Sequence, residues 1–165
     1  MRIALAQINP ISGDIAGNAA KIVDAMREAS VRKADLVVTP EMALPGYCIG
    51  DLVEDAEFLA ANEQAMQSIA AAARDVTAVV GFVDVDPSAR NDNGTIRKYN
   101  AAAVVRNGRV LQRARKTLLP NYRYFDDKRF FAPGDRRDPV TVPGGHDPVS
   151  LGVSICEDMM MNADG

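Results

Sequence analysis

The stretch that decides the fold is Leu36-Val37-Val38-Thr39-Pro40-Glu41. Its β-branched residues favour a short buried strand, and the strand has to end at Pro40 because proline has no N–H to donate to a sheet. Glu41 therefore stands immediately past a strand end. Functional side chains in α/β sheets gather where strand ends meet one edge, so Glu41 is a candidate site residue.

The segments around this strand alternate between strand and helix patterns. Residues 2–8 are apolar on both faces, which is typical of a strand buried in the middle of an α/β layer. Residues 15–29 and about 55–74 carry apolar side chains at helical spacing, and residues 77–83 form another apolar run. This alternation predicts an α/β fold.

The second half of the chain is less regular. Asn107-Gly108 supplies two residues that tolerate positive φ, so it predicts a tight hairpin between strands over 99–106 and 109–115. The polar residues 84–98 indicate a surface loop.

A long irregular connection is expected over 118–148, where prolines interrupt any helical or strand spacing of the apolar residues. Residues 149–155 then form an apolar strand that leads to Cys156. No repeat or linker divides the chain, so we expect one domain.

Composition excludes several classes of protein. Of 165 residues, 47% are apolar and 25% charged, and the net charge of −3 with no basic block argues against a nucleic-acid partner. No run approaches the roughly 18 apolar residues of a membrane span, and the first residues are too short an apolar run for a signal peptide. We therefore expect a cytoplasmic protein whose two cysteines, Cys48 and Cys156, are free thiols.

Common phosphate and metal motifs are missing. Neither G-x-x-x-x-G-K-[ST] nor G-x-G-x-x-G occurs, which disfavours a nucleotide site. The one histidine, His146, and two distant cysteines make a zinc site hard to assemble, so no metal is expected. A Cys-His catalytic pair would have to use His146, which otherwise is an exposed loop residue.

Three candidate residues occupy equivalent places relative to the expected strands. Glu41, Lys116 and Cys156 each come directly after the end of a strand. A thiol with a pKa of about 8.5 needs a base or a cation nearby to act as a nucleophile. Glu41 could take the thiol proton, and Lys116 could favour the anion. Lowering the thiol pKa by about 1.5 units would take roughly 2 kcal/mol, which one close ammonium can supply.

Spacing alone leaves other interpretations open. Glu41 could be a carboxylate at a helix start. Lys116 could be solvated with Arg113 and Arg115, and Cys156 could be an inert core thiol.

Three ordered motifs resemble the signatures of the nitrilase, or carbon-nitrogen hydrolase, superfamily. They are the stretch from Leu36 to Tyr47; Lys116-Thr117-Leu118-Leu119-Pro120-Asn121-Tyr122 with Phe125-Asp126-Asp127-Lys128-Arg129-Phe130-Phe131; and Gly152-Val153-Ser154-Ile155-Cys156-Glu157-Asp158. The residues in these motifs are similar to those of the N-terminal glutaminase domains of glutamine-dependent NAD synthetases.

The resemblance implies a four-layer αββα sandwich, with residues 1–165 as the N-terminal portion of a glutaminase domain. The remainder of that domain, and a synthetase domain using ATP and magnesium, would lie outside these residues. It also implies a homo-oligomer at full length and no cofactor for the amide chemistry.

Residue roles follow from the same resemblance. Glu41 would be the general base, Lys116 would stabilise the oxyanion, and Cys156 would attack the amide of glutamine and form a thioester. Tyr122 would line the glutamine pocket. Asp127, which stands where the family has glutamate, would help to bind the substrate. If it positions Lys116 or the substrate, its shorter side chain could displace that partner by about 1 Å and lower the rate on the order of 100-fold.

Two alternatives remain at this point. The substrate could be another small amide, as in other nitrilase-type amidases. The chain could also be an inactive fragment or an association module.

Overall fold

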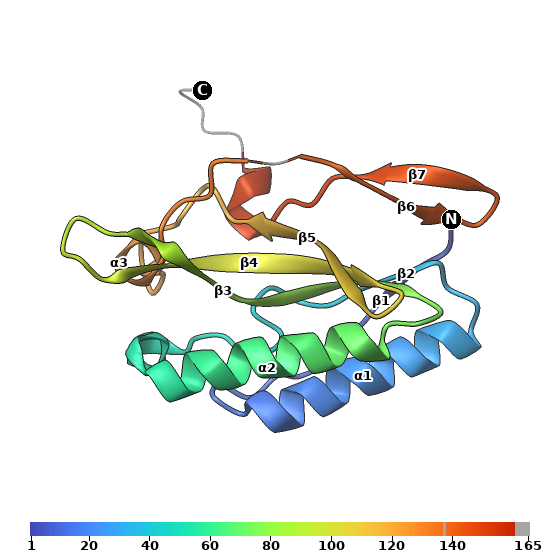
Figure 1. The fold of residues 1–165 in the computed structure, drawn as a ribbon, viewed down its shortest axis with the longest axis horizontal. Helices are drawn as coiled ribbons and strands as arrows, with labels where there is room; N and C mark the ends of the chain where they lie inside the picture. The colour runs from blue at the N-terminus through green and yellow to red at the C-terminus, as the bar shows by residue number, and fades with distance from the viewer. Residues whose placement is uncertain (137, 161–165) are drawn as a thin grey trace.

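A five-stranded sheet is the centre of the molecule, whose computed structural model describes residues 1–136 and 138–160 (Figure 1). The strand order follows the chain, with β1, β2 and β3 parallel and β3, β4 and β5 antiparallel. The strands are β1 (Ile3–Leu5), β2 (Leu36–Val38), β3 (Thr77–Arg90), β4 (Ile96–Arg106) and β5 (Arg109–Arg115).

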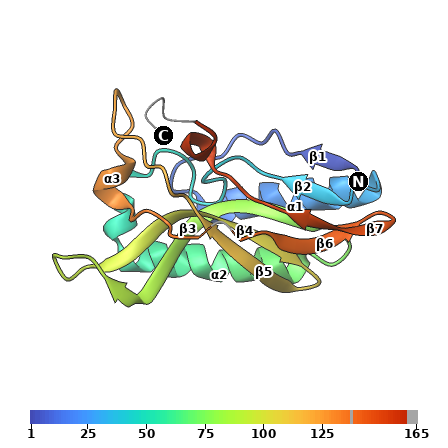
Figure 2. The ribbon, with the colours of Figure 1, turned by 90° about the horizontal axis from the view of Figure 1, so that it is seen from above.

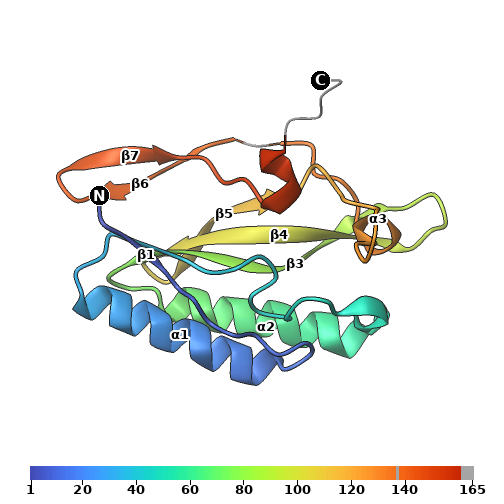
Figure 3. The same ribbon diagram turned by 180° about the vertical axis from the view of Figure 1, so that it is seen from behind.

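Two helices, α1 (Ile15–Val31) and α2 (Ala56–Ala72), cover one face of this sheet, as Figures 1 and 3 show. Each begins at an aspartate whose side chain accepts backbone N–H groups of the first turn. A 3₁₀ helix, η1 (Gly50–Glu54), precedes α2. The two helices predicted from apolar spacing are confirmed.

The opposite face of the sheet is covered by a second hairpin, made of β6 (Val140–Gly144) and β7 (Asp147–Leu151) (Figure 2). Val142 from this hairpin and Ile155 after it pack on β2, β3 and β4, in a cluster separate from the one under the helices. Burial on both faces explains why β2 and the central parts of β3 and β4, residues 78–83 and 101–105, are apolar. The α/β fold class is confirmed, and the helix layer and sheet have the arrangement expected of one half of the αββα sandwich.

The expectation that residues 2–8 form a central buried strand is wrong. β1 has three residues and lies at the edge, where its only partner among the described residues is β2. Ile3 is 54% and Leu5 69% exposed. Apolar residues on both faces indicated burial, but the described part of the chain supplies nothing to pair with the outer edge of β1.

The expected surface loop over 84–98 is mostly strand. β3 runs to Arg90 and β4 begins at Ile96, and Gly94 at φ 84° helps close the turn between them. The polar residues were misleading because Asp84 and Lys98 are buried in the sheet, and only the ribbon beyond Asp86 extends past the core toward solvent. The Asn107-Gly108 turn is confirmed, with φ of 51° and 76°.

The segment over 118–148 is also more regular than expected. It contains the short helix α3 (Asp127–Phe130) and all of β6. Pro143 pairs with Pro148 across the hairpin, which a two-stranded ribbon tolerates because each strand has an open edge. The strand expected over 149–155 ends at Leu151, and the residues that follow cross the sheet without pairing.

Candidate active site

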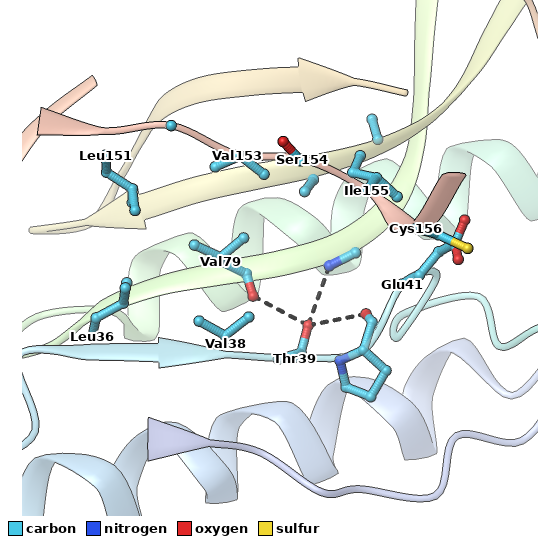
Figure 4. Close-up of a pocket in the computed structure, with 15 residues that line it drawn as sticks. Leu36, Val38, Thr39, Glu41, Val79, Leu151, Val153, Ser154, Ile155 and Cys156 are labelled. Atoms are coloured by element: carbon cyan, nitrogen blue, oxygen red, sulfur yellow. Dashed lines mark hydrogen bonds between the residues drawn. The ribbon is translucent and has the colours of Figure 1, made fainter. Parts of the chain in front are cut away.

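Glu41 lies in the loop that follows β2 and crosses over β3. The N–H of Gly81 donates to Thr39 Oγ1 at 3.2 Å, and the Thr39 hydroxyl donates to the Val79 carbonyl at 3.2 Å (Figure 4). A Cβ on Gly81 would lie 2.5 Å from the Pro40 carbonyl oxygen. Glycine at position 81 therefore lets this loop rest directly on the strand.

Lys116 follows β5, where its N–H donates to the Asn100 carbonyl at 2.8 Å. Its side chain is buried, with 1% exposed, and turns toward two carboxylates. Nζ donates to Glu41 Oε1 at 2.7 Å and to Asp127 Oδ2 at 2.8 Å. Aspartate at position 127 thus reaches the lysine despite its shorter side chain, because α3 places it there.

Cys156 opens a single 3₁₀ turn, η2 (Cys156–Met159), and has a left-handed φ of 47°. Its thiol is exposed and free, as is that of Cys48, so the expectation of free thiols is confirmed. Asp158 fixes this turn to the segment after Lys116, because its Oδ1 accepts the N–H groups of Thr117 at 2.9 Å and Leu118 at 2.8 Å.

Glu41 and Cys156 lie at the same end of a cavity of about 210 Å³ (Figure 4). The cavity continues as an apolar passage between the sheet and residues 151–155. Reacting groups at the end of an apolar cavity are typical of a small-molecule site.

The electrostatics of the cysteine differ from the expectation. Burial and then the charge of Glu41 raise the pKa of the Cys156 thiol, while Lys116 lowers it by less, so the thiol is protonated at neutral pH. Lys116 does not act as a free cation, because it is shared between Glu41 and Asp127. Burial alone would lower the pKa of Lys116, but its hydrogen bonds to Asp127 and Glu41 raise it.

Tyr122 lies beside this cluster without joining it. Its hydroxyl donates to Glu157 Oε2 at 3.0 Å, and this hydrogen bond raises the pKa of Tyr122. It lines an open pocket formed mainly by residues 117–122, and its side chain remains half exposed.

Two further residues contact the cluster, and the sequence reasoning gave neither of them a role in the site. Asn100 Nδ2 donates to Glu41 Oε1 at 2.7 Å, and the Tyr47 hydroxyl donates to Asp127 Oδ1 at 3.4 Å. Burial and then the charge of Asp127 raise the pKa of Tyr47. The one available hint was the polar Asn100 inside an apolar strand.

The alternative site residue, His146, is exposed in the turn between β6 and β7, which lies away from η2 in Figures 1 and 2. Within residues 1–136 and 138–160, no cluster of three His, Cys, Asp or Glu side chains could hold a metal ion. Nor does this part of the chain contain a helix with the length and apolarity needed to span a membrane.

Comparison with known proteins places these motifs in one family. Residues 2–163 match the carbon-nitrogen hydrolase family. The glutamine-dependent NAD(+) synthetase of Thermotoga maritima is 42% identical over 161 residues, which are 96% of this chain and 26% of that protein. The Synechocystis synthetase is 39% identical over 95% of this chain. The chain therefore spans about a quarter of the length of these relatives.

Solved structures give the same relationship. The glutamine-dependent NAD+ synthetase of Acinetobacter baumannii has a TM-score of 0.76 and 33% identity, over 95% of this chain and 28% of its own. An amidase from Nesterenkonia has a TM-score of 0.68 and 26% identity, over 91% of this chain and 54% of its own. One variant of that amidase carries the acetamide moiety of fluoroacetamide on its active-site cysteine. On the match over residues 2–163 and these relatives, the chain belongs to the carbon-nitrogen hydrolase family.

Proposed function

We propose that this chain carries the chemistry of glutamine amide hydrolysis, which releases ammonia through a thioester on Cys156. The observation that carries the proposal is the ammonium of Lys116 held between Glu41 and Asp127, beside the cysteine. Glutamine is proposed as the substrate because relatives at 42% and 39% identity are glutamine-dependent synthetases.

The first half of the reaction forms the thioester. Glu41 takes the thiol proton while Sγ attacks the amide carbon, so the charge of the site stays constant and no free thiolate is needed. The tetrahedral intermediate then collapses, the C–N bond breaks, and ammonia leaves with the proton from Glu41.

The second half releases the acid. Water gives a proton to Glu41 and attacks the thioester carbon, and the C–S bond breaks as the sulfur regains a proton. The products are glutamate and the free thiol.

Lys116 has the donor that the oxyanion needs. An ammonium has three hydrogens, and two of them are directed to Glu41 and Asp127. The third remains for the oxygen of the tetrahedral intermediate. The proposed chemistry requires only these side chains and water, and we assign ATP and magnesium to the synthetase reaction of the full-length relatives.

A second candidate, hydrolysis of another small amide, is favoured by one observation. The Nesterenkonia amidase has the same fold over 91% of this chain. The two candidates differ in recognition, because a glutamine site has to bind an α-amino and an α-carboxylate group and would reject amides that lack them. Tyr122 and Glu157, beside the cysteine, are the residues we propose for that end of the substrate.

The test is the mass of the chain after incubation with a diazoketone analogue of glutamine. We expect one rapid addition that glutamine blocks, that Cys156→Ser abolishes and that Cys48→Ser leaves intact. Protection by acetamide but not by glutamine would favour the second candidate. Slow labelling of both cysteines alike would overturn both and leave an inactive or association module.

A further inference from the structure

Within residues 1–136 and 138–160, the side chains of Asn100 and Lys116 donate to one oxygen of the Glu41 carboxylate. Its Oε1 accepts two hydrogen bonds at 2.7 Å, one from Lys116 Nζ and one from Asn100 Nδ2. Both donors occupy the same oxygen, which leaves Oε2 for the proton of Cys156.

The amide of Asn100 has one orientation that suits this arrangement. Asn100 lies in β4 with 1% exposed, and its Oδ1 is buried without a hydrogen-bond partner among the described residues. A buried acceptor left unpaired is destabilising, because it loses its hydrogen bonds to water and gains none in return. Turning the amide over would aim Oδ1 at the carboxylate of Glu41, so the orphaned oxygen is the consequence of presenting Nδ2 to Glu41.

Asn100 also contacts the second proposed catalytic residue. Its backbone carbonyl accepts the N–H of Lys116 at 2.8 Å, at the end of the β4–β5 ladder. One residue therefore connects the base, through its side chain, to the lysine, through its main chain.

We infer that Asn100 is a positioning residue. Its amide holds Oε1 of the Glu41 carboxylate by a hydrogen bond, which directs Oε2 to the thiol of Cys156. This inference rests on the proposed role of Glu41 as the base. Without the amide, the carboxylate is held by Lys116 alone and can rotate away from the sulfur. A displacement of about 1 Å lowers a rate on the order of 100-fold.

The experiment measures alkylation of Cys156 by iodoacetamide across a pH series, with intact mass as readout. All variants carry Cys48→Ser, so one addition reports one thiol. Glu41→Gln removes the carboxylate charge that raises the pKa of the Cys156 thiol, and Asn100→Ala lets that carboxylate turn away from the sulfur. Both variants should therefore move the profile to lower pH and speed alkylation about 10-fold at neutral pH. Both should converge with the parent at alkaline pH, where the thiol is ionised in every variant.

Asn62→Ala is the matched control. Asn62 is a fully buried asparagine of α2 whose amide bonds the Val83 backbone, away from the cysteine. It should lower thermal stability and leave the alkylation profile unchanged. Asn100→Asp keeps the shape of the side chain and sets a carboxylate against Glu41, so it should move the profile to higher pH even if Asn100→Ala folds poorly. None of the Asn100 variants changes the other groups that titrate around the thiol, namely Glu41, Lys116, Tyr122, Asp127, Glu157 and Asp158.

Each outcome decides the question. Profiles of Asn100→Ala and Glu41→Gln that coincide support the inference. If Glu41→Gln moves the profile to lower pH while both Asn100 variants match Asn62→Ala, the inference is overturned and the proposed function stands. If Glu41→Gln has the profile of the parent, the base itself is wrong and both proposals fall.

Discussion

One lysine between two carboxylates sets the chemistry at the scale of single residues. The nearby thiol keeps its proton because burial, and then the charge of Glu41, raise its pKa more than Lys116 lowers it. In the proposed reaction, proton transfer from Cys156 to Glu41 moves a charge within the site without changing the total. A thiolate formed by loss of its proton to solvent would add a third anion.

Asp127 is expected to act through Lys116. Asp127→Ala removes one of the two carboxylates that orient Nζ, so we expect ammonia release from glutamine to fall about 100-fold. Asp127→Glu keeps the charge and should retain most of the rate. Steady-state kinetics check this, and equal loss in both variants would mean that only the exact side-chain length matters.

Secondary-structure elements carry the next level of organisation, because loops from three parts of the chain meet at the site. The loop after β2 rests on β3 at Gly81, and the turn of Cys156 is fixed to residues 117–118 by Asp158. Neither contact is local in sequence, so each can be tested by one substitution.

Gly81→Ala should push the Glu41 loop away from β3. Its Cβ would meet backbone atoms at 2.5 Å, which cannot turn aside as a side chain would, and overpacking of this kind costs about 1 to 3 kcal/mol. Urea unfolding should show this loss, together with slower labelling of Cys156. The control is Gly152→Ala, where nothing lies within 4 Å of the added Cβ and stability should be unchanged.

Asp158 should make the site sensitive to acid. Burial alone would raise its pKa, but hydrogen bonds from Leu118, Thr117 and Ile155 lower it below the ordinary value of 3.8. A lowered folded-state pKa means that the stabilisation is present above about 3.8 and is lost as the pH falls through the folded-state value.

Asp158→Asn removes this titration. We expect a loss of about 1 to 3 kcal/mol at neutral pH and a shallower decline of stability in acid. Thermal unfolding over a pH series measures both. An acid decline as steep as that of the parent would assign the effect to other carboxylates.

At the scale of the whole molecule, the described residues leave the sheet edge at β1 open. Ile3 and Leu5 are largely exposed there, and an unpaired apolar edge is a template for association. Leu5→Lys should therefore reduce concentration-dependent self-association, measured by light scattering on a sizing column. Val31→Lys is the control, because Val31 is more exposed still but lies at the end of α1. Equal effects of the two substitutions would show that general apolar exposure, rather than the edge, drives association.

The helices, the Asn107-Gly108 hairpin and the α/β class could be predicted because period and turn chemistry are local properties. Other features depend on which segments meet in space, and the spacing of apolar residues does not encode that. They are the edge position of β1, the ribbon beyond Asp84 and the paired prolines of β6 and β7. Motifs placed Glu41, Lys116 and Cys156 in one family pattern, and their roles stay predictions. The direction of the thiol pKa was wrong because the sequence does not show that the thiol is partly buried beside the carboxylate of Glu41.

The left-handed backbone conformation of Cys156 affects which residues can replace this cysteine during evolution. A residue with a Cβ is disfavoured at φ 47°, by about 1 to 2 kcal/mol, while glycine adopts this conformation freely and asparagine with less difficulty than most residues. Folding alone therefore favours replacement of the cysteine, and only selection for its sulfur opposes it. In lineages that abandon amide chemistry but keep the fold, we expect position 156 to drift first toward glycine or asparagine. We expect cysteine to persist at this position where the proposed reaction is still under selection.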